Sequence, residues 1–255
     1  MSVTGRYETL DWAERWFADA FAVIDFPGGL ALLDVDMTRS KVILERMKAK
    51  GLAATYGHIL VRAVAMALAR HPELHVMVAG STRFVPGRVD IGLSVGGQTN
   101  YAPPMILEDA ANKKVEELSA EITRRVPEIR EKEAKDLDWV RRWGWIIPFR
   151  FLRRAMLSFF FQKVWFRKNL AGTFQVSSLP GVDVVVPFLF NSAAVYGAGR
   201  VRDRVVAVDG VPVVRPIVTL SVCIDHKIWD GVRAATFHGT VRKILESGEI
   251  ESEIA

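Results

Sequence analysis

The chain has 255 residues, half of them hydrophobic, so it holds enough apolar material for a sizeable core, and global disorder is excluded. The single cysteine, Cys223, excludes an internal disulfide framework, and no uncharged apolar stretch approaches the roughly 20 residues of a membrane-spanning helix. The net charge of +5 is local, because residues 139–168 hold eight Lys or Arg and no Asp or Glu, and no nucleic-acid-binding module accompanies it.

The first half of the chain alternates helical and strand patterns. Gly51 stands where a helix C-terminal cap is expected, and His71-Pro72 ends the next helix. The clearest amphipathic helix begins at Val115, with apolar residues three or four apart up to Ile129. Helices are expected at 7–25, 38–51, 55–70 and 115–129, and strands at 30–37, near 84, at 89–95 and at 101–107.

The last third of the chain is typical of strands. Asp209-Gly210 suits the type I′ turn of a hairpin. The alternation of apolar and polar residues over 218–224 predicts a half-buried strand, and a closing helix follows over 231–246. Further strands are expected at 172–179, 184–190 and 193–201. The simplest account is a single α+β domain over 1–255, built on a mixed sheet with flanking helices.

The stretch CIDHKIWDG at 223–231 lies where the last strand passes into the last helix. Its pattern Asp225-His226-Lys227-x-x-Asp230-Gly231 resembles the catalytic domain of the acyltransferase subunit of 2-oxo-acid dehydrogenase complexes. Peptide-synthetase condensation domains share the motif core, but they usually carry two adjacent histidines and are much longer. The other segments in the family's order and spacing are Gly172-Thr173-Phe174, Gly197-x-Gly199-Arg200-Val201, Val208-Asp209-Gly210, Arg215-Pro216-x-x-Thr219-Leu220, and, upstream, 71–74 and 89–95.

The resemblance covers roughly residues 30–246 and implies a chloramphenicol acetyltransferase-like fold in two layers. It also implies acyl transfer with coenzyme A as a substrate, no metal, and a homotrimer with active sites between subunits. The five histidines stand alone, without the spacing of zinc ligands. The N-terminal residues 1–16 carry acids where a signal peptide needs a basic start, which indicates a cytoplasmic protein.

By resemblance, His226 is the general base and Ser177 stabilises the tetrahedral oxyanion. A thiol with a pKa of about 8.5 is mostly protonated at neutral pH, so thiol-to-thiol transfer needs such a base. Asp230 is grouped with them as a catalytic-site residue that keeps the site in shape, and an Asp before a helix is also a good N-cap. The expected coenzyme A contacts are Ser178, which also rivals Ser177, together with Lys227 and Gly231.

Several residues near the motif have two interpretations. Asp225 either orients the imidazole or faces solvent. Lys227 stands where the family usually has Arg. Lysine lacks the planar guanidinium group with which arginine forms two parallel hydrogen bonds. Cys223 is expected to be a buried small residue and not a nucleophile. Gly231 is expected to allow close backbone approach at the helix start, and the other four histidines are expected to be structural or exposed.

The chain departs from the family in three places. No lipoyl-type or subunit-binding domain precedes the catalytic segment, so the acyl group is expected from coenzyme A, a separate lipoyl protein or a separate carrier protein. The segment 139–168 is an insertion with 10 of the 25 aromatic residues, and two interpretations stay open: an element packed in the oligomer, or a contact with a membrane surface. The acidic end, ESGEIESEIA, does not favour a large cage.

The sequence therefore predicts an acyltransferase that moves an acyl group between thiols or to another acceptor. The competing hypothesis is a non-catalytic trimeric scaffold or membrane-associated adaptor with the same fold. The presence of His226, Ser177 and the Asp230-Gly231 pair favours the enzyme, since a scaffold needs none of them.

Overall fold

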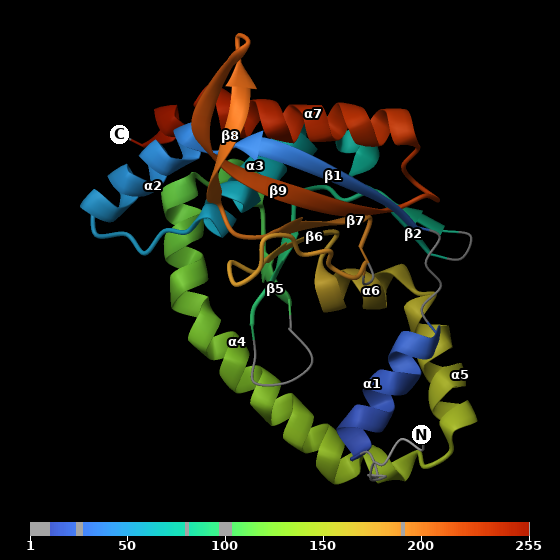
Figure 1. The fold of residues 1–255 in the computed structure, drawn as a ribbon. Helices are drawn as coiled ribbons and strands as arrows, with labels where there is room; N and C mark the ends of the chain where they lie inside the picture. The colour runs from blue at the N-terminus through green and yellow to red at the C-terminus, as the bar shows by residue number, and fades with distance from the viewer. Residues whose placement is uncertain (1–10, 24–27, 80–81, 97–103, 190–191, 255) are drawn as a thin grey trace, which may run out of the picture.

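The protein is described from a computed structural model, which places residues 11–23, 28–79, 82–96, 104–189 and 192–254 (Figure 1). Its centre is a seven-stranded mixed sheet of strand order β1-β9-β7-β6-β4-β5, with β8 paired to β9. The pairs β4–β6 and β6–β7 are parallel and the others are antiparallel. The strands are β1 (Gly28–Asp36), β4 (Ile91–Ser94), β5 (Pro104–Leu107), β6 (Phe174–Ser178), β7 (Ala194–Ala198), β8 (Arg202–Val208) and β9 (Val211–Asp225).

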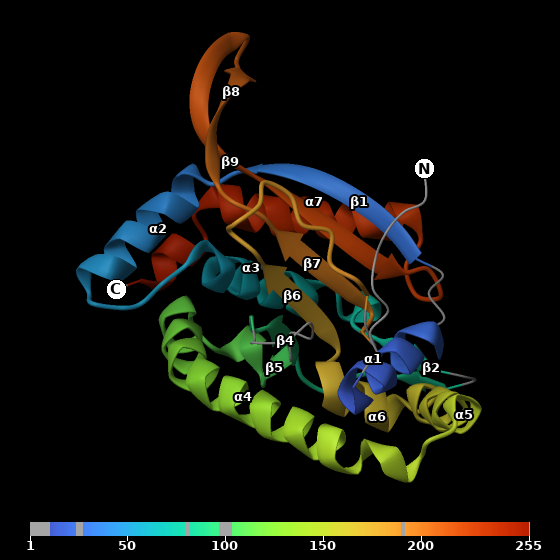
Figure 2. The same ribbon diagram turned by 60° about the horizontal axis from the view of Figure 1, so that its bottom comes forward.

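Helices α3 (Tyr56–Arg70) and α7 (Gly231–Ser247) cover one face of this sheet (Figures 1 and 2). Thr55 caps α3, as its hydroxyl accepts from the His58 N–H at 3.4 Å, and nearly all of the helix is buried. That burial on several sides explains its nearly continuous apolar sequence. The sheet and these helices form the predicted α+β fold. The remaining α-helices are α1 (Trp12–Val23), α2 (Thr38–Ala49), α4 (Val115–Trp143), α5 (Arg150–Phe161) and α6 (Val164–Ala171).

Short elements complete the described part of the chain. Strands β2 (Met77–Ala79) and β3 (Thr82–Phe84) form a separate two-stranded sheet. Four 3-10 turns are described: η1 (Pro72–Leu74), η2 (Ala110–Asn112), η3 (Gly144–Ile146) and η4 (Ile250–Glu253). Within the residues described, no helix has both the length and the apolarity needed to cross a bilayer.

The hairpin of β8 and β9 projects from the sheet, at the top of Figure 1. Its turn residues Asp209 and Gly210 have φ angles of 50° and 80°, the left-handed values that a type I′ turn requires at both central positions. The predicted turn is therefore confirmed. Gly51, which was expected to cap a helix, likewise has a positive φ of 75°.

Two sequence predictions of secondary structure were wrong in extent or type. The helix expected over 115–129 continues to Trp143 and carries the chain away from the sheet. The described residues of the strand expected at 184–190 form no strand, although they alternate between exposed and less exposed side chains. Side chains hold this segment to the sheet, since the Ser221 hydroxyl donates to the Val185 carbonyl and the Cys223 Sγ lies 3.2 Å from the Pro187 carbonyl oxygen.

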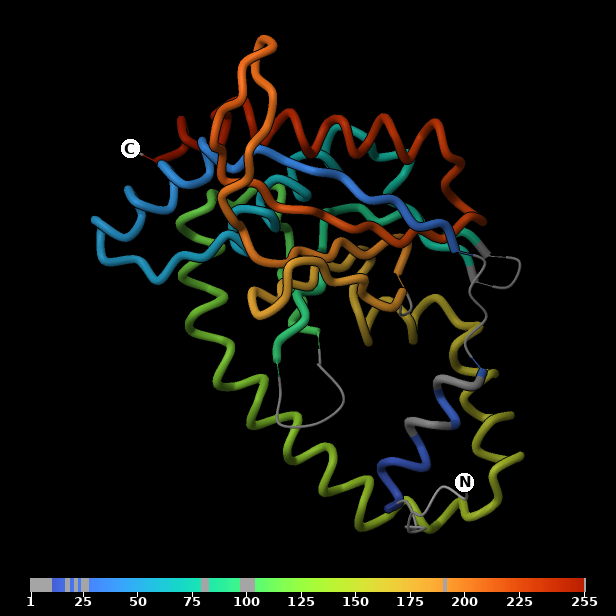
Figure 3. The backbone as a smooth tube through the Cα atoms, viewed as in Figure 1, coloured from blue at the N-terminus to red at the C-terminus, as the bar shows by residue number. Residues whose placement is uncertain are grey.

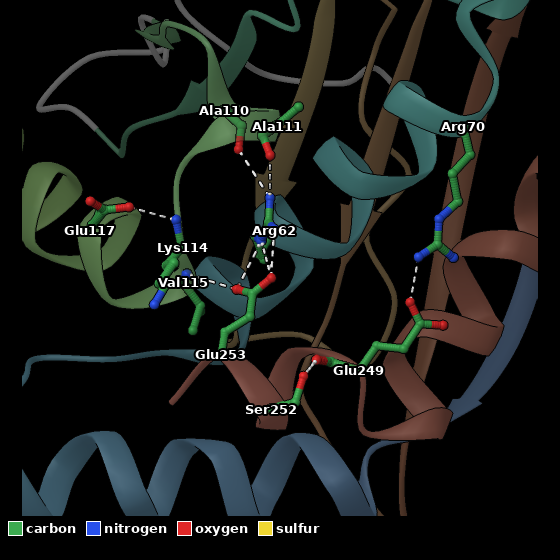
Figure 4. A network of polar contacts seen from close by, with 10 residues as sticks. All are labelled: Arg62, Arg70, Ala110, Ala111, Lys114, Val115, Glu117, Glu249, Ser252 and Glu253. Carbon is green, nitrogen blue, oxygen red and sulfur yellow. Dashed lines mark hydrogen bonds and ion pairs between the residues drawn. The ribbon is translucent and has the colours of Figure 1, made fainter. Parts of the chain in front are cut away.

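The residues after α7 pack onto the molecule (Figure 4). Ile250 and Ile254 are buried. The Glu253 carboxylate accepts from Arg62 at 2.5 to 3.0 Å and from the Val115 N–H at 3.3 Å. Arg62 also donates to the Ala111 carbonyl at 2.8 Å. The acidic end therefore joins α3 to the start of α4.

The insertion predicted at 139–168 forms the end of α4, η3, α5 and part of α6. Helix α5 packs against α1, although helices α2, α3 and α4 lie between them in sequence, as the traces in Figures 2 and 3 show. We call α1, the last turns of α4, η3 and α5 the helical lobe. In Figure 1 it lies at the end of the molecule opposite the β8–β9 hairpin.

Candidate active site

The turn between β9 and α7 carries His226 on its outside. The Asp225 carboxylate accepts from the Lys227 N–H at 3.0 Å, and the Asp225 carbonyl accepts from the N–H groups of Ile228 and Trp229. Trp229 is fully buried, and its indole N–H donates to the Leu74 carbonyl at 3.1 Å. These bonds hold the turn against the core while His226 remains exposed.

Asp225 differs from both sequence interpretations. It does not face solvent, because only 4% of it is exposed, and among the described residues its carboxylate accepts from the backbone of the turn and not from the imidazole. The residue closes the turn that displays His226. Trp229 was not predicted to matter, although a tryptophan between the two motif residues was a signal that the turn is anchored in a core.

His226 lines a groove of about 440 Å³ between β1 and α7. Gly29 of β1 lies beside the imidazole, since a Cβ on this glycine would be 3.4 Å from His226 Cδ2. Gly231 lines the same groove, but a Cβ there would meet open space, so the predicted close backbone approach at the helix start does not occur among the described residues. Open space beside an exposed imidazole leaves room for a substrate.

Ser177 and Ser178 point to opposite faces of β6. A Cβ on Gly57 would lie 3.1 Å from the Ser178 hydroxyl, so Ser178 faces the start of α3. Side chains alternate along a strand, and Ser177 therefore faces away from the helices. In the part of the chain that the structure describes, neither the Ser177 hydroxyl nor the His226 imidazole has a hydrogen-bond partner.

The fold does not bring Ser177 and His226 together within one chain. The strand register sets Ser177 level with Gly197 of β7, and Gly197 level with Ser221 of β9. His226 lies five residues beyond Ser221, which is roughly 17 Å along the strand, and β6 and β9 are roughly 10 Å apart across the sheet. An intermediate next to His226 is out of reach of the same chain's Ser177.

The face toward which Ser177 points is rich in exposed apolar side chains. The segment 182–189 crosses this face over β7 and β9 and turns alternate side chains outward. Leu30 and Leu32 of β1 lie on the same face, since they pair with Cys223 and Ser221. The exposed apolar residues of this face are Leu30, Leu32, Val182, Val184, Val186 and Phe188.

The other four histidines have polar partners inside the fold, as predicted for structural histidines. Burial lowers the pKa of His58, His75 and His238 to about 4, so these rings are neutral at pH 7. Cys223 is buried, and burial raises its thiol pKa, which does not suit a nucleophile. The partners of the histidines are Ser119 for His58, Thr240 for His71, Thr173 for His75 and Tyr196 for His238.

Asp230 caps α7, because its carboxylate accepts from the Arg233 N–H at 2.8 Å. Asp230→Ala is expected to lower the free energy of unfolding by about 1 kcal/mol, whereas Asp230→Ser keeps an acceptor and most of the stability. Urea denaturation of the two variants measures this difference. If Asp230→Ser kept its stability but lost most of its acyl-transfer activity, Asp230 would have a chemical role beyond the cap.

Among the described residues, no three His, Cys, Asp or Glu side chains gather as a metal site requires. Lys227 is exposed in the His226 turn, so the structure places Lys227 and Gly231 with His226, whereas Ser178 lies against α3.

Comparison with known proteins identifies the family of the chain. A family model described as "2-oxoacid dehydrogenases acyltransferase (catalytic domain)" matches residues 27–140 and 169–251. The lipoamide acyltransferase component of the branched-chain alpha-keto acid dehydrogenase complex of Bacillus subtilis is 24% identical over 229 residues, with 88% of this chain and 47% of the relative covered. The chain thus spans about half the length of the curated relatives it matches.

Solved structures share the fold. A probable dihydrolipoamide acetyltransferase from Listeria monocytogenes superposes with a TM-score of 0.71 at 21% identity, covering 95% of both chains. A chloramphenicol acetyltransferase superposes with a TM-score of 0.52 at 14% identity, covering 91% of this chain and 95% of the other. The predicted chloramphenicol acetyltransferase-like fold is confirmed. The family match omits residues 141–168, which lie within the predicted insertion.

Proposed function

Since the chain belongs to the family of 2-oxoacid dehydrogenase acyltransferase catalytic domains, we propose that it transfers an acyl group between two thiols, one of them coenzyme A. The other thiol belongs to a lipoyl group or to a carrier protein. The observation that carries the proposal is the position of His226, exposed on an anchored turn at the edge of a groove that a substrate can enter.

His226 acts as the general base in this proposal. It takes the proton of the attacking thiol, and the resulting thiolate adds to the carbonyl carbon of the thioester. The tetrahedral intermediate then collapses, the carbon–sulfur bond of the original thioester breaks, and the departing thiolate recovers the proton from the imidazolium. The four other histidines are not suited to this role, because each is hydrogen-bonded to a side chain inside the fold.

Ser177 donates a hydrogen bond to the oxyanion of that intermediate, from a neighbouring subunit. A donor aimed at developing charge lowers the barrier to acyl transfer. Two features support the shared site: the distance between Ser177 and His226 within one chain, and the apolar face toward which Ser177 points. Burying such a face between subunits is favourable at about 25 cal/mol per Å² of apolar surface. We propose a homotrimer that joins these faces.

Coenzyme A approaches through the open space beside Gly231, and the exposed Lys227 lies where it can attract the phosphates. Ser178 is the weakest of the three predicted contacts, because its hydroxyl is directed at the start of α3 in its own chain. It contacts coenzyme A only if the cofactor reaches that side of β6.

Acyl transfer is tested with the purified protein and a panel of acyl-coenzyme A thioesters, with dihydrolipoamide as the acceptor. The expected result is thiol exchange above background with at least one member of the panel, measured as release of free coenzyme A. Equal background rates for the wild type and His226→Ala across the whole panel, with carrier-bound acceptors included, would favour the scaffold hypothesis instead.

A further inference from the structure

The helical lobe draws on two parts of the chain that the family match leaves out, the described residues 11–23 and residues 141–161. They are joined by a buried cluster. Asp19 is 2% exposed and accepts from Arg153 at 2.7 Å, from Arg154 at 3.0 Å and from Arg150 at 3.2 Å. Burial alone would raise the pKa of Asp19, but the bonds from these arginines more than offset it and hold the pKa below its usual value. The two segments therefore form one specific unit.

Further contacts fix the turn between α4 and α5 in this unit. The Trp16 indole N–H donates to the Gly144 carbonyl at 3.3 Å, and Arg153 donates to the carbonyls of Ile147 and Pro148 at 3.0 and 2.7 Å. The backbone of the turn is thus held by buried polar groups. Its apolar side chains are nevertheless directed outward.

We call residues 139–152 the aromatic turn. The exposed fraction of the residue is 65% for Trp139, 61% for Phe149 and 71% for Phe151. Burying one large apolar side chain is worth about 1.5–3 kcal/mol, so this exposure is costly unless another surface covers it. The exposed apolar members are Trp139, Trp143, Trp145, Ile146, Phe149, Phe151 and Leu152.

The helical lobe carries a net positive charge. Residues 139–161 hold five Arg and no Asp or Glu, and the described residues before β1 add three acids and one arginine, which leaves these two segments with a net charge of +3. The Arg142 guanidinium lies 5.5 Å from the centre of the Trp143 ring, and both side chains are exposed. An exposed tryptophan beside an arginine matches the region where lipid headgroups meet acyl chains.

We propose that the aromatic turn docks the protein on a lipid bilayer that carries anionic headgroups. The apolar rings enter the headgroup boundary, and the exposed Arg142 contacts lipid phosphates and carboxylates. A second copy of this chain fits the surface less well, since a two-fold contact would bring two positive lobes together. Only four residues separate the end of α1 from the start of β1, whose Gly29 lies beside His226, so docking of the lobe holds the active-site groove near the membrane.

Co-sedimentation with vesicles tests the docking. The wild type is expected to bind vesicles of phosphatidylglycerol and phosphatidylcholine at low salt, and to bind pure phosphatidylcholine at least about tenfold more weakly. The triple variant Trp145→Ser, Phe149→Ser, Phe151→Ser is expected to lose at least about tenfold in partitioning, because each ring is removed from the lipid boundary. Its urea midpoint is expected to match the wild type, since these side chains are exposed.

Two matched controls sharpen the test. Val205→Ser with Val214→Ser removes exposed apolar residues from the opposite end of the molecule and is expected to leave binding unchanged. Arg142→Glu is expected to weaken binding more than Arg124→Glu, although both residues are exposed on α4. The docking is refuted if the wild type stays in the supernatant, if salt and anionic lipid have no effect, or if the triple variant binds as well as the wild type. A lower molar mass of the triple variant in light scattering would assign the aromatic turn to an interface between protein subunits, and would also overturn the docking.

Discussion

His226→Ala is expected to lower kcat/KM for thiol-to-thiol acyl transfer by roughly 100- to 10,000-fold, because the attacking thiol then has no base beside it. Ser177→Ala is expected to lower kcat by roughly 100-fold, which is the usual loss on removing one donor to a tetrahedral oxyanion. His226 is exposed and Ser177 makes no hydrogen bond to the described residues, so both variants should unfold at the wild-type urea concentration. Release of free coenzyme A measures the activity.

The two variants together test whether the site is shared between subunits. When His226→Ala and Ser177→Ala chains are unfolded, mixed in equal amounts and refolded, some interfaces combine an intact His226 with an intact Ser177. Random assembly of a cyclic trimer predicts about a quarter of the wild-type sites, and so about a quarter of its activity. Each variant refolded alone provides the background.

The shared site is contradicted if the mixture shows no more activity than the separate variants while light scattering reports mixed trimers. A wild-type protein that is monomeric at assay concentration would contradict it as well. Val232→Ala is the control for unspecific damage near the site: Val232 is 79% exposed in the first turn of α7, and its removal is expected to change kcat/KM by less than about twofold.

Local signals in the sequence predicted the structure wherever a few neighbouring residues determine it. The Asp209-Gly210 turn, the cap at Asp230 and the end of α3 at His71-Pro72 all lie where they were expected. In each case one side chain or one backbone preference acts within four residues. Tertiary contacts are not needed for these features, so the sequence alone was sufficient.

The features that were missed depend on contacts between distant segments. Helix α4 continues past Ile129 with few apolar residues. Its end packs against α1, and no local sequence pattern predicts a contact between these two distant segments. The segment 184–189 has the alternation of a strand, but side chains of β9 hold it across the face of the sheet. Periodicity distinguishes exposed from buried positions and says nothing about which partner pairs with the backbone.

The candidate site was predicted by residue but not by arrangement. The alternation of Phe174, Val176 and Ser178 toward the core was readable in the sequence and would have directed Ser177 to the opposite face. The distance between Ser177 and His226 was not readable, because it follows from the order of β6, β7 and β9 in the sheet. Strand order is a property of the whole fold.

Arg62→Ala is expected to lower the free energy of unfolding by about 3–5 kcal/mol, because it leaves the Glu253 carboxylate largely buried without its cation. Only 11% of the Arg62 side chain and 14% of the Glu253 side chain are exposed. Arg62 also satisfies the carbonyls of Ala110 and Ala111 at the start of the loop into α4 (Figure 4). Urea denaturation at pH 7 measures the loss.

Arg70→Ala is the matched control, because Arg70 lies on the same helix and pairs with Glu249 in the same C-terminal segment (Figure 4). That pair is 44% and 32% exposed, and its loss is expected to cost less than about 1 kcal/mol. The double variant Arg62→Leu, Glu253→Leu should unfold at a higher urea concentration than Arg62→Leu alone, since no unpaired charge remains. Equal losses for Arg62→Ala and Arg70→Ala would mean that the C-terminal residues are attached loosely. The link from Glu253 to the start of α4 would then contribute little to the fold.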